Sequence, residues 1–160
     1  MKQVFEQVRL PGGITVANRL VRSATWEGVA ETDGSMPPQA WPIYEDLATG
    51  GVGLLITGFT SVSQDDVYIA EPMRLSADAL VPQYASLVDT IHAHGCPTMP
   101  QLALGGFYRR LSAQNAELIE ADGMSLQEIQ QVVSLFAPLR GGRNRRALTA
   151  CRFTRPTSFS

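Results

Sequence analysis

The stretch Tyr44-Glu-Asp-Leu-Ala-Thr-Gly-Gly-Val-Gly-Leu-Leu-Ile-Thr-Gly58 joins the end of an amphipathic segment to a short apolar run. Apolar side chains recur at helical spacing up to this point, at Trp41, Tyr44, Leu47 and Ala48. This spacing predicts a helix over residues 39–49, and the glycines at positions 50 and 51 are a natural helix stop. Residues 52–56 are then almost continuously apolar and of strand length, which is typical of a parallel strand covered on both faces.

Strands and helices also alternate along the sequence before and after this stretch. Before it, residues 4–16 predict two short extended pieces around a turn at residues 11–13, and residues 20–24 predict a strand. After it, residues 81–92 predict a helix stopped by Gly95, and residues 98–102 predict a strand. Residues 60–78 and 103–108 are expected to be loops. This order predicts an α/β fold with parallel strands, either an open doubly wound sheet or a (β/α)8 barrel.

A capping box predicts the start of a third helix. Ser125 and Glu128 have the spacing at which each side chain bonds the other residue's backbone amide. The apolar stripe of this helix is expected at Ile129, Val132, Val133 and Phe136.

Length and composition fit one globular domain. The chain has 160 residues, of which 44% are hydrophobic and 18% are charged. It contains no run of about 18 apolar residues, so no membrane-spanning helix is expected, and the first residues lack the apolar core of a secretory signal. Cys96 and Cys151 are too few for a disulfide framework, so we predict a cytoplasmic protein.

Charge is distributed very unevenly along the chain. Residues 1–137 hold 7 Lys+Arg and all 15 Asp+Glu, whereas residues 138–160 hold six arginines and no acid. The formal charges of the two parts are therefore −8 and +6, which give the −2 of the whole chain. The arginine-rich part also loses hydrophobic periodicity, so we expect an irregular tail over residues 138–160. One interpretation is a small non-enzymatic α/β protein whose tail binds nucleic acid or an acidic partner.

Hydroxyl or amide groups beside small residues mark the C-terminal end of each predicted strand, at residues 23–26, 57–60 and 101–103. The carboxyl ends of barrel strands are where ligands bind, and this pattern suits a flat polar ligand held partly by backbone amides. Gln101 is expected to be buried with a ligand or backbone partner, because an unpartnered amide there would be costly. Trp26 is either core packing or a wall of the ligand site.

Two other patterns are interpreted structurally. His92, His94 and Cys96 lie together at a helix end. A zinc site needs three or four ligands that converge on one point, and only these three candidates are present, so no metal is predicted. Asp65 and Asp66 lie in an expected polar loop and are predicted to be solvated.

Three blocks of the sequence, taken in order, resemble the Old Yellow Enzyme family of NADH:flavin oxidoreductases. They are residues 18–28 (Asn-Arg-Leu-Val-Arg-Ser-Ala-Thr-Trp-Glu-Gly), residues 44–58 quoted above, and residues 92–103 (His-Ala-His-Gly-Cys-Pro-Thr-Met-Pro-Gln-Leu-Ala). The resemblance covers roughly residues 3–137 and implies the first three strand–helix units of a (β/α)8 TIM barrel. Residues 1–137 are therefore expected to be the N-terminal part of an FMN-binding barrel.

The resemblance implies a set of cofactor-binding residues. Ser23, Ala24 and Thr25 match the end of strand one, which packs on the FMN ring and bonds it through the backbone. Gly58 matches the end of strand two beside the ring, and the amide of Gln101 matches the one that bonds the pyrimidine edge.

The sequence also departs from the family pattern at three positions. Trp26 stands where many relatives have Thr or Cys to tune the flavin, and an indole offers no hydroxyl or thiol there. Leu104 and Phe107 stand where relatives have His and Arg. The family's catalytic His pair is not found in this chain, so its catalytic residues are unknown.

The resemblance stops after about residue 137, where we suspect a shifted reading frame. Plausible GC-rich codons for residues 146–157, read from the third base, translate as Gly-Phe-Asp-Gly-Val-Gln-Ile-His-Ala-Ala-His. That string resembles the family's fourth strand with both histidines. Residues 138–160 are thus interpreted as a non-homologous frameshift product.

The function implied by the resemblance is that of an FMN-dependent NAD(P)H oxidoreductase. Such an ene-reductase-like enzyme passes hydride from NAD(P)H through the flavin to a small molecule with an activated C=C bond. We expect the truncated chain by itself to bind FMN weakly or not at all and to be inactive. No membrane or nucleic-acid partner is expected.

Overall fold

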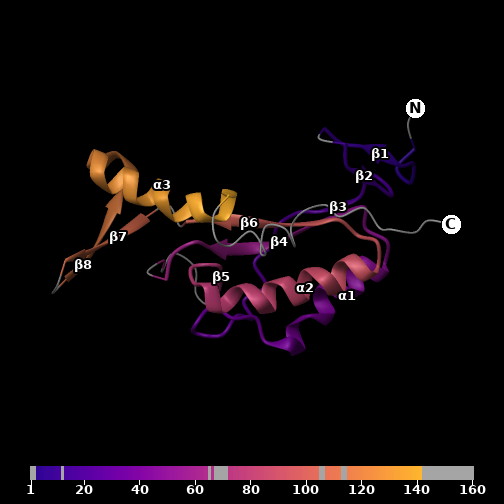
Figure 1. Ribbon diagram of the computed structural model, residues 1–160, viewed down its shortest axis with the longest axis horizontal. Helices are drawn as coiled ribbons and strands as arrows, with labels where there is room; N and C mark the ends of the chain where they lie inside the picture. Colours follow the sequence, from indigo (N-terminus) through magenta and orange to yellow (C-terminus); the bar gives the residue numbers. More distant parts are fainter. Residues whose placement is uncertain are drawn as a thin grey trace.

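The computed structural model describes residues 3–11, 13–64, 66, 72–104, 107–112 and 115–141. Its centre is a four-stranded parallel sheet built around β4 (Leu54–Ser61). β3 (Val21–Arg22) pairs with the beginning of β4, and β5 (Met73–Arg74) pairs with its end. β6 (Thr98–Ala103) pairs with β4 along the other edge. Within the described residues this is an open α/β sheet (Figure 1).

The strand predicted at residues 52–56 is present, but it begins two residues later and is longer. β4 begins at Leu54 and continues to Ser61, so Thr60 and Ser61 belong to the sheet and not to the expected loop. Six of the eight residues of β4 are buried, including Leu55 and Thr57 at 0% exposure, as expected for a strand covered on both faces.

Two helices lie along the sheet and bury its apolar side chains (Figure 1). A 3₁₀ turn, η1 (Pro38–Ala40), leads into α1 (Pro42–Thr49), and η2 (Asp78–Leu80) leads into α2 (Val81–Ala93). Both helices end where the sequence predicts, because Gly51 and Gly95 adopt φ angles of 79° and 71°, which disfavour other residues. The fully buried side chains of the core include Tyr44, Leu55, Leu87, Val88 and Ile91.

Two hairpins flank the sheet at opposite ends of the molecule (Figure 1). The first joins β1 (Val8–Arg9) to β2 (Thr15–Val16), as the sequence predicts. The second joins β7 (Phe107–Ser112) to β8 (Asn115–Glu120), so residues 107 and 108 begin a strand where a loop was expected. The short turn η3 (Ala121–Gly123) connects this hairpin to the last helix.

The last helix, α3 (Leu126–Gly141), starts at the predicted capping box. The Ser125 amide donates to Glu128 Oε2 at 2.8 Å, and the Glu128 amide donates to Ser125 Oγ at 3.3 Å. The helix continues past residue 137 to Gly141, so the expected irregular tail does not begin at 138; residues 142–160 lie outside the described residues.

The predicted apolar stripe of α3 is not uniformly buried. Leu135 and Phe136 pack against the core, whereas Ile129 and Val133 are 43% and 61% exposed. The single stripe expected from spacing is therefore wrong for half of its members.

Asp66 is buried, contrary to the expectation that it is solvated. It is 4% exposed and accepts a hydrogen bond from Ser61 Oγ at 2.8 Å, while Arg74 donates to its backbone carbonyl at 3.0 Å. The segment after β4 folds back on the end of the strand, which brings this carboxylate under cover. Asp65 lies outside the described residues.

No helix among the described residues is long and apolar enough to cross a membrane.

Candidate functional site

The predicted site residues come from three neighbouring strands. Ser23, Ala24, Thr25 and Trp26 directly follow β3, Gly58 lies within β4, and Gln101 lies within β6. Because β3 and β6 pair with opposite edges of β4, they flank it on either side. Gln101 stands opposite Phe59, the residue after Gly58, and the Thr25 carbonyl oxygen lies 2.5 Å from where a Cβ on Gly58 would be.

Exposure separates these residues into two groups. Gly58 is buried and Ala24 is half-buried, whereas Ser23, Thr25 and Gln101 are exposed and Trp26 is 49% exposed. The expectation that Gln101 is buried is therefore wrong. Leu102 packs against the core, and alternation along β6 turns the preceding side chain to the opposite face. Trp26 is likewise not part of the core.

Gly58 lies at an irregularity in the sheet. The register between β4 and β6 shifts between Ile56 and Phe59, so Thr57 and Gly58 form a bulge in β4. A Cβ at position 58 would collide with the carboxylate of Glu27 and with the Thr25 carbonyl oxygen. Only glycine lets the segment after β3, at Thr25 and Glu27, approach β4 this closely.

A chain of polar contacts runs behind this bulge. The Gly58 amide donates to Tyr44 Oη at 3.1 Å, and the Tyr44 hydroxyl donates to Glu27 Oε1 at 2.7 Å. The same carboxylate forms an ion pair with Arg22, whose guanidinium also donates to the carbonyl of Ile56 at 2.8 Å. The Arg22 guanidinium lies 5.3 Å from the centre of the Tyr44 ring, close enough for a cation–π contact.

A second tyrosine holds the bulge from the other helix. Tyr84 Oη lies 2.7 Å from Thr57 Oγ1 and 2.9 Å from Thr60 Oγ1. Thr60 in turn donates to the Gly58 carbonyl at 3.1 Å. Burial raises the pKa of the Tyr44 phenol far above its ordinary value, so this hydroxyl remains protonated and able to donate.

Sequence reasoning did not assign a role at the site to Arg22, Glu27 or Tyr44. Tyr44 was predicted only as an inward-facing apolar residue. The available signal was an Arg and a Glu on either side of the short segment that follows β3, since charges in an otherwise buried neighbourhood are usually paired.

The contacts around the two histidines do not form a metal centre. His94 Nε2 lies 3.6 Å from Glu45 Oε1, and the buried Cys96 thiol donates to the Val52 carbonyl at 3.3 Å. Burial lowers the pKa of His92 and raises that of Cys96 to about 11. In the part of the chain that the structure describes, no three His, Cys, Asp or Glu side chains converge.

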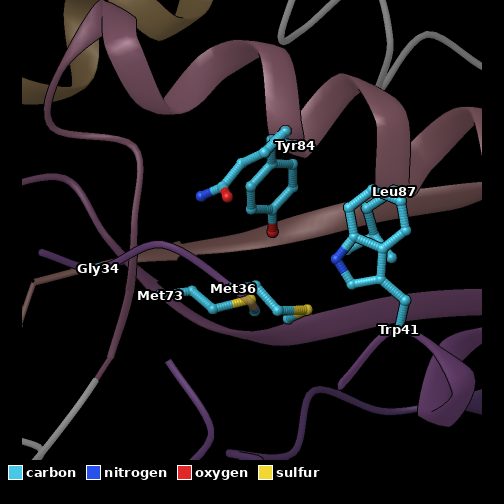
Figure 2. Close-up of a pocket in the computed structure, with 7 residues that line it drawn as sticks. Gly34, Met36, Trp41, Met73, Tyr84 and Leu87 are labelled. Atoms are coloured by element: carbon cyan, nitrogen blue, oxygen red, sulfur yellow. The ribbon is translucent and has the colours of Figure 1, made fainter. Parts of the chain in front are cut away.

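A small pocket lies apart from the predicted residues. Figure 2 shows Tyr84 and Leu87 of α2 above Met36, Met73 and Trp41. Its lining is almost entirely apolar and includes none of the six predicted site residues.

Several curated proteins similar to this chain are named as an NADH-dependent flavin oxidoreductase or as NADPH dehydrogenases, while no protein-family model matches the chain. Over 102 residues the chain is 36% identical to an N,N-dimethylglycine/sarcosine dehydrogenase of Chromohalobacter salexigens and 35% identical to an NADH-dependent flavin oxidoreductase, iliE, of Hypocrea jecorina. These matches take in 62% and 59% of this chain but span only 14% and 25% of those proteins. An NADPH dehydrogenase of Listeria welshimeri is 32% identical over 107 residues, which are 66% of this chain and 31% of that protein.

Solved structures of Old Yellow Enzymes share the fold. The homologue from Zymomonas mobilis superposes with a TM-score of 0.72 at 19% identity, over 94% of this chain and 46% of that one. The enzyme from Trypanosoma cruzi gives a TM-score of 0.58 at 26% identity, over 64% of this chain and 27% of that one. The resemblance inferred from the three sequence blocks is thereby confirmed, and it extends over less than half of either of these two structures.

Proposed function

We propose that this chain, which is similar in sequence and fold to part of the NAD(P)H-dependent flavin oxidoreductases of the Old Yellow Enzyme type, contributes one side of an FMN site. The corresponding whole protein would transfer hydride from NAD(P)H through FMN to an activated C=C bond of a small molecule. Residues 1–137 would supply the first three strand–helix units of a (β/α)8 barrel. The open parallel sheet and its helix cover support this proposal.

The observation that carries the proposal is a row of groups that lie on, or directly after, the neighbouring strands β3, β4 and β6. We call this row the sheet edge. Ser23, Thr25 and Gln101 expose hydroxyl and amide groups, and Trp26 exposes an indole. Gly58 has no side chain, so the Thr25 backbone can lie close to β4. A flat heteroaromatic ring needs an apolar face and donors and acceptors at its edge, and these residue types fit both needs.

Each residue would have a separate task at this edge. The Gln101 amide would offer both a donor and an acceptor to the pyrimidine edge of the flavin. The backbone of residues 23–25 would bond the ring, and the absence of a side chain at Gly58 lets that backbone lie close to β4. FMN, when bound, supplies the redox chemistry, while the protein supplies binding and orientation.

The first prediction concerns the isolated chain. We expect weak FMN binding, with a Kd on the order of 0.1 mM, because most of the ring and phosphate contacts of a complete site lie elsewhere. We also expect no NAD(P)H oxidation. Titrating the ¹⁵N-labelled chain with FMN and following its amide shifts tests the first point, and NAD(P)H absorbance tests the second. Stoichiometric, tightly bound flavin with turnover would contradict the prediction.

The second prediction concerns the arginine-rich residues 138–160. We propose that they are encoded in a shifted frame, because their charge, +6 without any acid, differs so sharply from the −8 of the preceding residues. Sequencing the coding DNA from codon 130 onward tests this. We expect the alternate frame to encode a strand with two histidines, and unrelated DNA in that frame would overturn the proposal.

A further inference from the structure

Two residues that the proposed cofactor site does not itself use lie directly behind it. Tyr44 accepts the Gly58 amide and donates its own hydroxyl to Glu27, so both groups of this phenol are engaged. The Gly58 N–H therefore points toward α1 and is already satisfied inside the protein. Its role is to fix the backbone at the bulge and not to bind a ligand.

Glu27 links the hydrogen bonds of Tyr44 and Gly58 to β3. Its carboxylate lies against the Cα of Gly58 and pairs with Arg22 at the end of β3. Arg22 also donates to the carbonyl of Thr25 at 3.4 Å. One ion pair thus contacts both the backbone that follows β3 and the bulge of β4, which are the two segments that carry most of the proposed flavin contacts.

A buried ion pair is an expensive way to fill this space. The Arg22 and Glu27 side chains are 12% and 6% exposed, and apolar side chains of similar volume commonly stabilise a protein at least as well as such a pair. Directional bonds supply what apolar packing does not, because they fix the separation of the two backbone segments.

We propose that Glu27 and Tyr44 are positioning residues for the sheet edge that would contact the flavin, because they hold the Gly58 bulge and the Thr25 backbone at one fixed separation. This inference rests on the proposed function. It predicts that removing the Tyr44 hydroxyl loosens the sheet edge. FMN binding should then weaken more than in a variant that loses the same stability elsewhere in the protein.

The test compares Tyr44→Phe with a matched control, Thr98→Val. Both delete one hydroxyl from a fully buried side chain, but Thr98 Oγ1 donates to the Leu55 carbonyl at the amino end of β6. Each ¹⁵N-labelled variant is titrated with FMN while amide shifts are followed, and its stability is measured by urea unfolding. We expect Tyr44→Phe to raise the Kd about tenfold and to speed hydrogen exchange of the Gly58 amide. Thr98→Val should change the Kd less than twofold at a comparable loss of stability.

A second variant, Glu27→Gln, separates charge from shape. It keeps an acceptor for the Tyr44 hydroxyl, so we expect a smaller rise in Kd, about twofold to threefold. Equal Kd values for Tyr44→Phe and Thr98→Val would overturn the positioning role while leaving the proposed function intact. Absence of FMN binding by the unmodified chain would overturn both. Unfolding of both site variants while Thr98→Val folds would also overturn it, since the residues would then serve the fold alone.

Discussion

Substituting Gly58→Ala is expected to destabilise the protein by about 1–3 kcal/mol and to abolish FMN binding. The added methyl group would meet the Glu27 carboxylate and, at 2.5 Å, the Thr25 carbonyl oxygen. The carboxylate is held by Arg22 and Tyr44, and the carbonyl is backbone, so neither can move aside without breaking other contacts. Urea unfolding measures the stability change, and the FMN titration measures binding.

Gly51→Ala provides the control for this substitution. Nothing lies within 4 Å of a Cβ at Gly51, so its cost is limited to the strain of its positive φ, roughly 1–2 kcal/mol. The two variants are thus expected to lose similar stability, but only Gly58→Ala should lose FMN binding. A Gly58→Ala protein with unchanged flavin affinity would show that close contact between Gly58 and the segment after β3 is not needed for flavin binding.

Substituting Glu27→Ala is expected to have the largest effect on folding, a loss of about 3–5 kcal/mol. The change leaves the Arg22 guanidinium largely buried without its carboxylate and removes the acceptor of the Tyr44 hydroxyl. Such a loss is a large fraction of the total stability of a typical domain. Urea unfolding measures this loss. If the loss is too large for urea unfolding, the fraction of soluble, folded protein relative to the unmodified chain measures it.

The double variant Arg22→Met/Glu27→Leu tests the cause. If the penalty comes from an unpaired buried charge, removing both charges should recover most of the loss in stability while FMN binding stays weak. A double variant as unstable as Glu27→Ala would show that the hydrogen bond to Tyr44, and not the charge pair, carries the stability.

The elements that sequence analysis predicted correctly share a strong local signal. α1 and α2 have apolar residues at helical spacing and end at glycines, and the start of α3 is determined by a side-chain pair three residues apart. These patterns depend on neighbouring residues alone, so the sequence displays them directly. β5 was missed because a strand of two residues carries little local signal, and the β7–β8 hairpin was missed because its strands lack clear alternation of apolar and polar residues.

The candidate site was only partly predictable for a different reason. Chain order predicts that the strand-end residues lie near one another, and the structure places them on, or directly after, three neighbouring strands. The contact between Glu27 and Gly58 joins residues far apart in sequence and arises from a bulge, which no periodicity reveals. The burial of Gln101 was predicted wrongly because the cost of hiding an amide was considered without knowing which face of β6 it occupies.

The strand order has a consequence for how the protein is made. β4 is the central strand, yet β6, which pairs along most of it, begins more than forty residues later, at Thr98. During synthesis β4 therefore remains unpaired with β6, its main partner strand, until residue 103 has left the ribosome. Sheets assembled from such distant segments form slowly, and their exposed strands are prone to aggregate meanwhile. Chaperone dependence of the nascent chain should accordingly be greatest while residues 54–103 are being made.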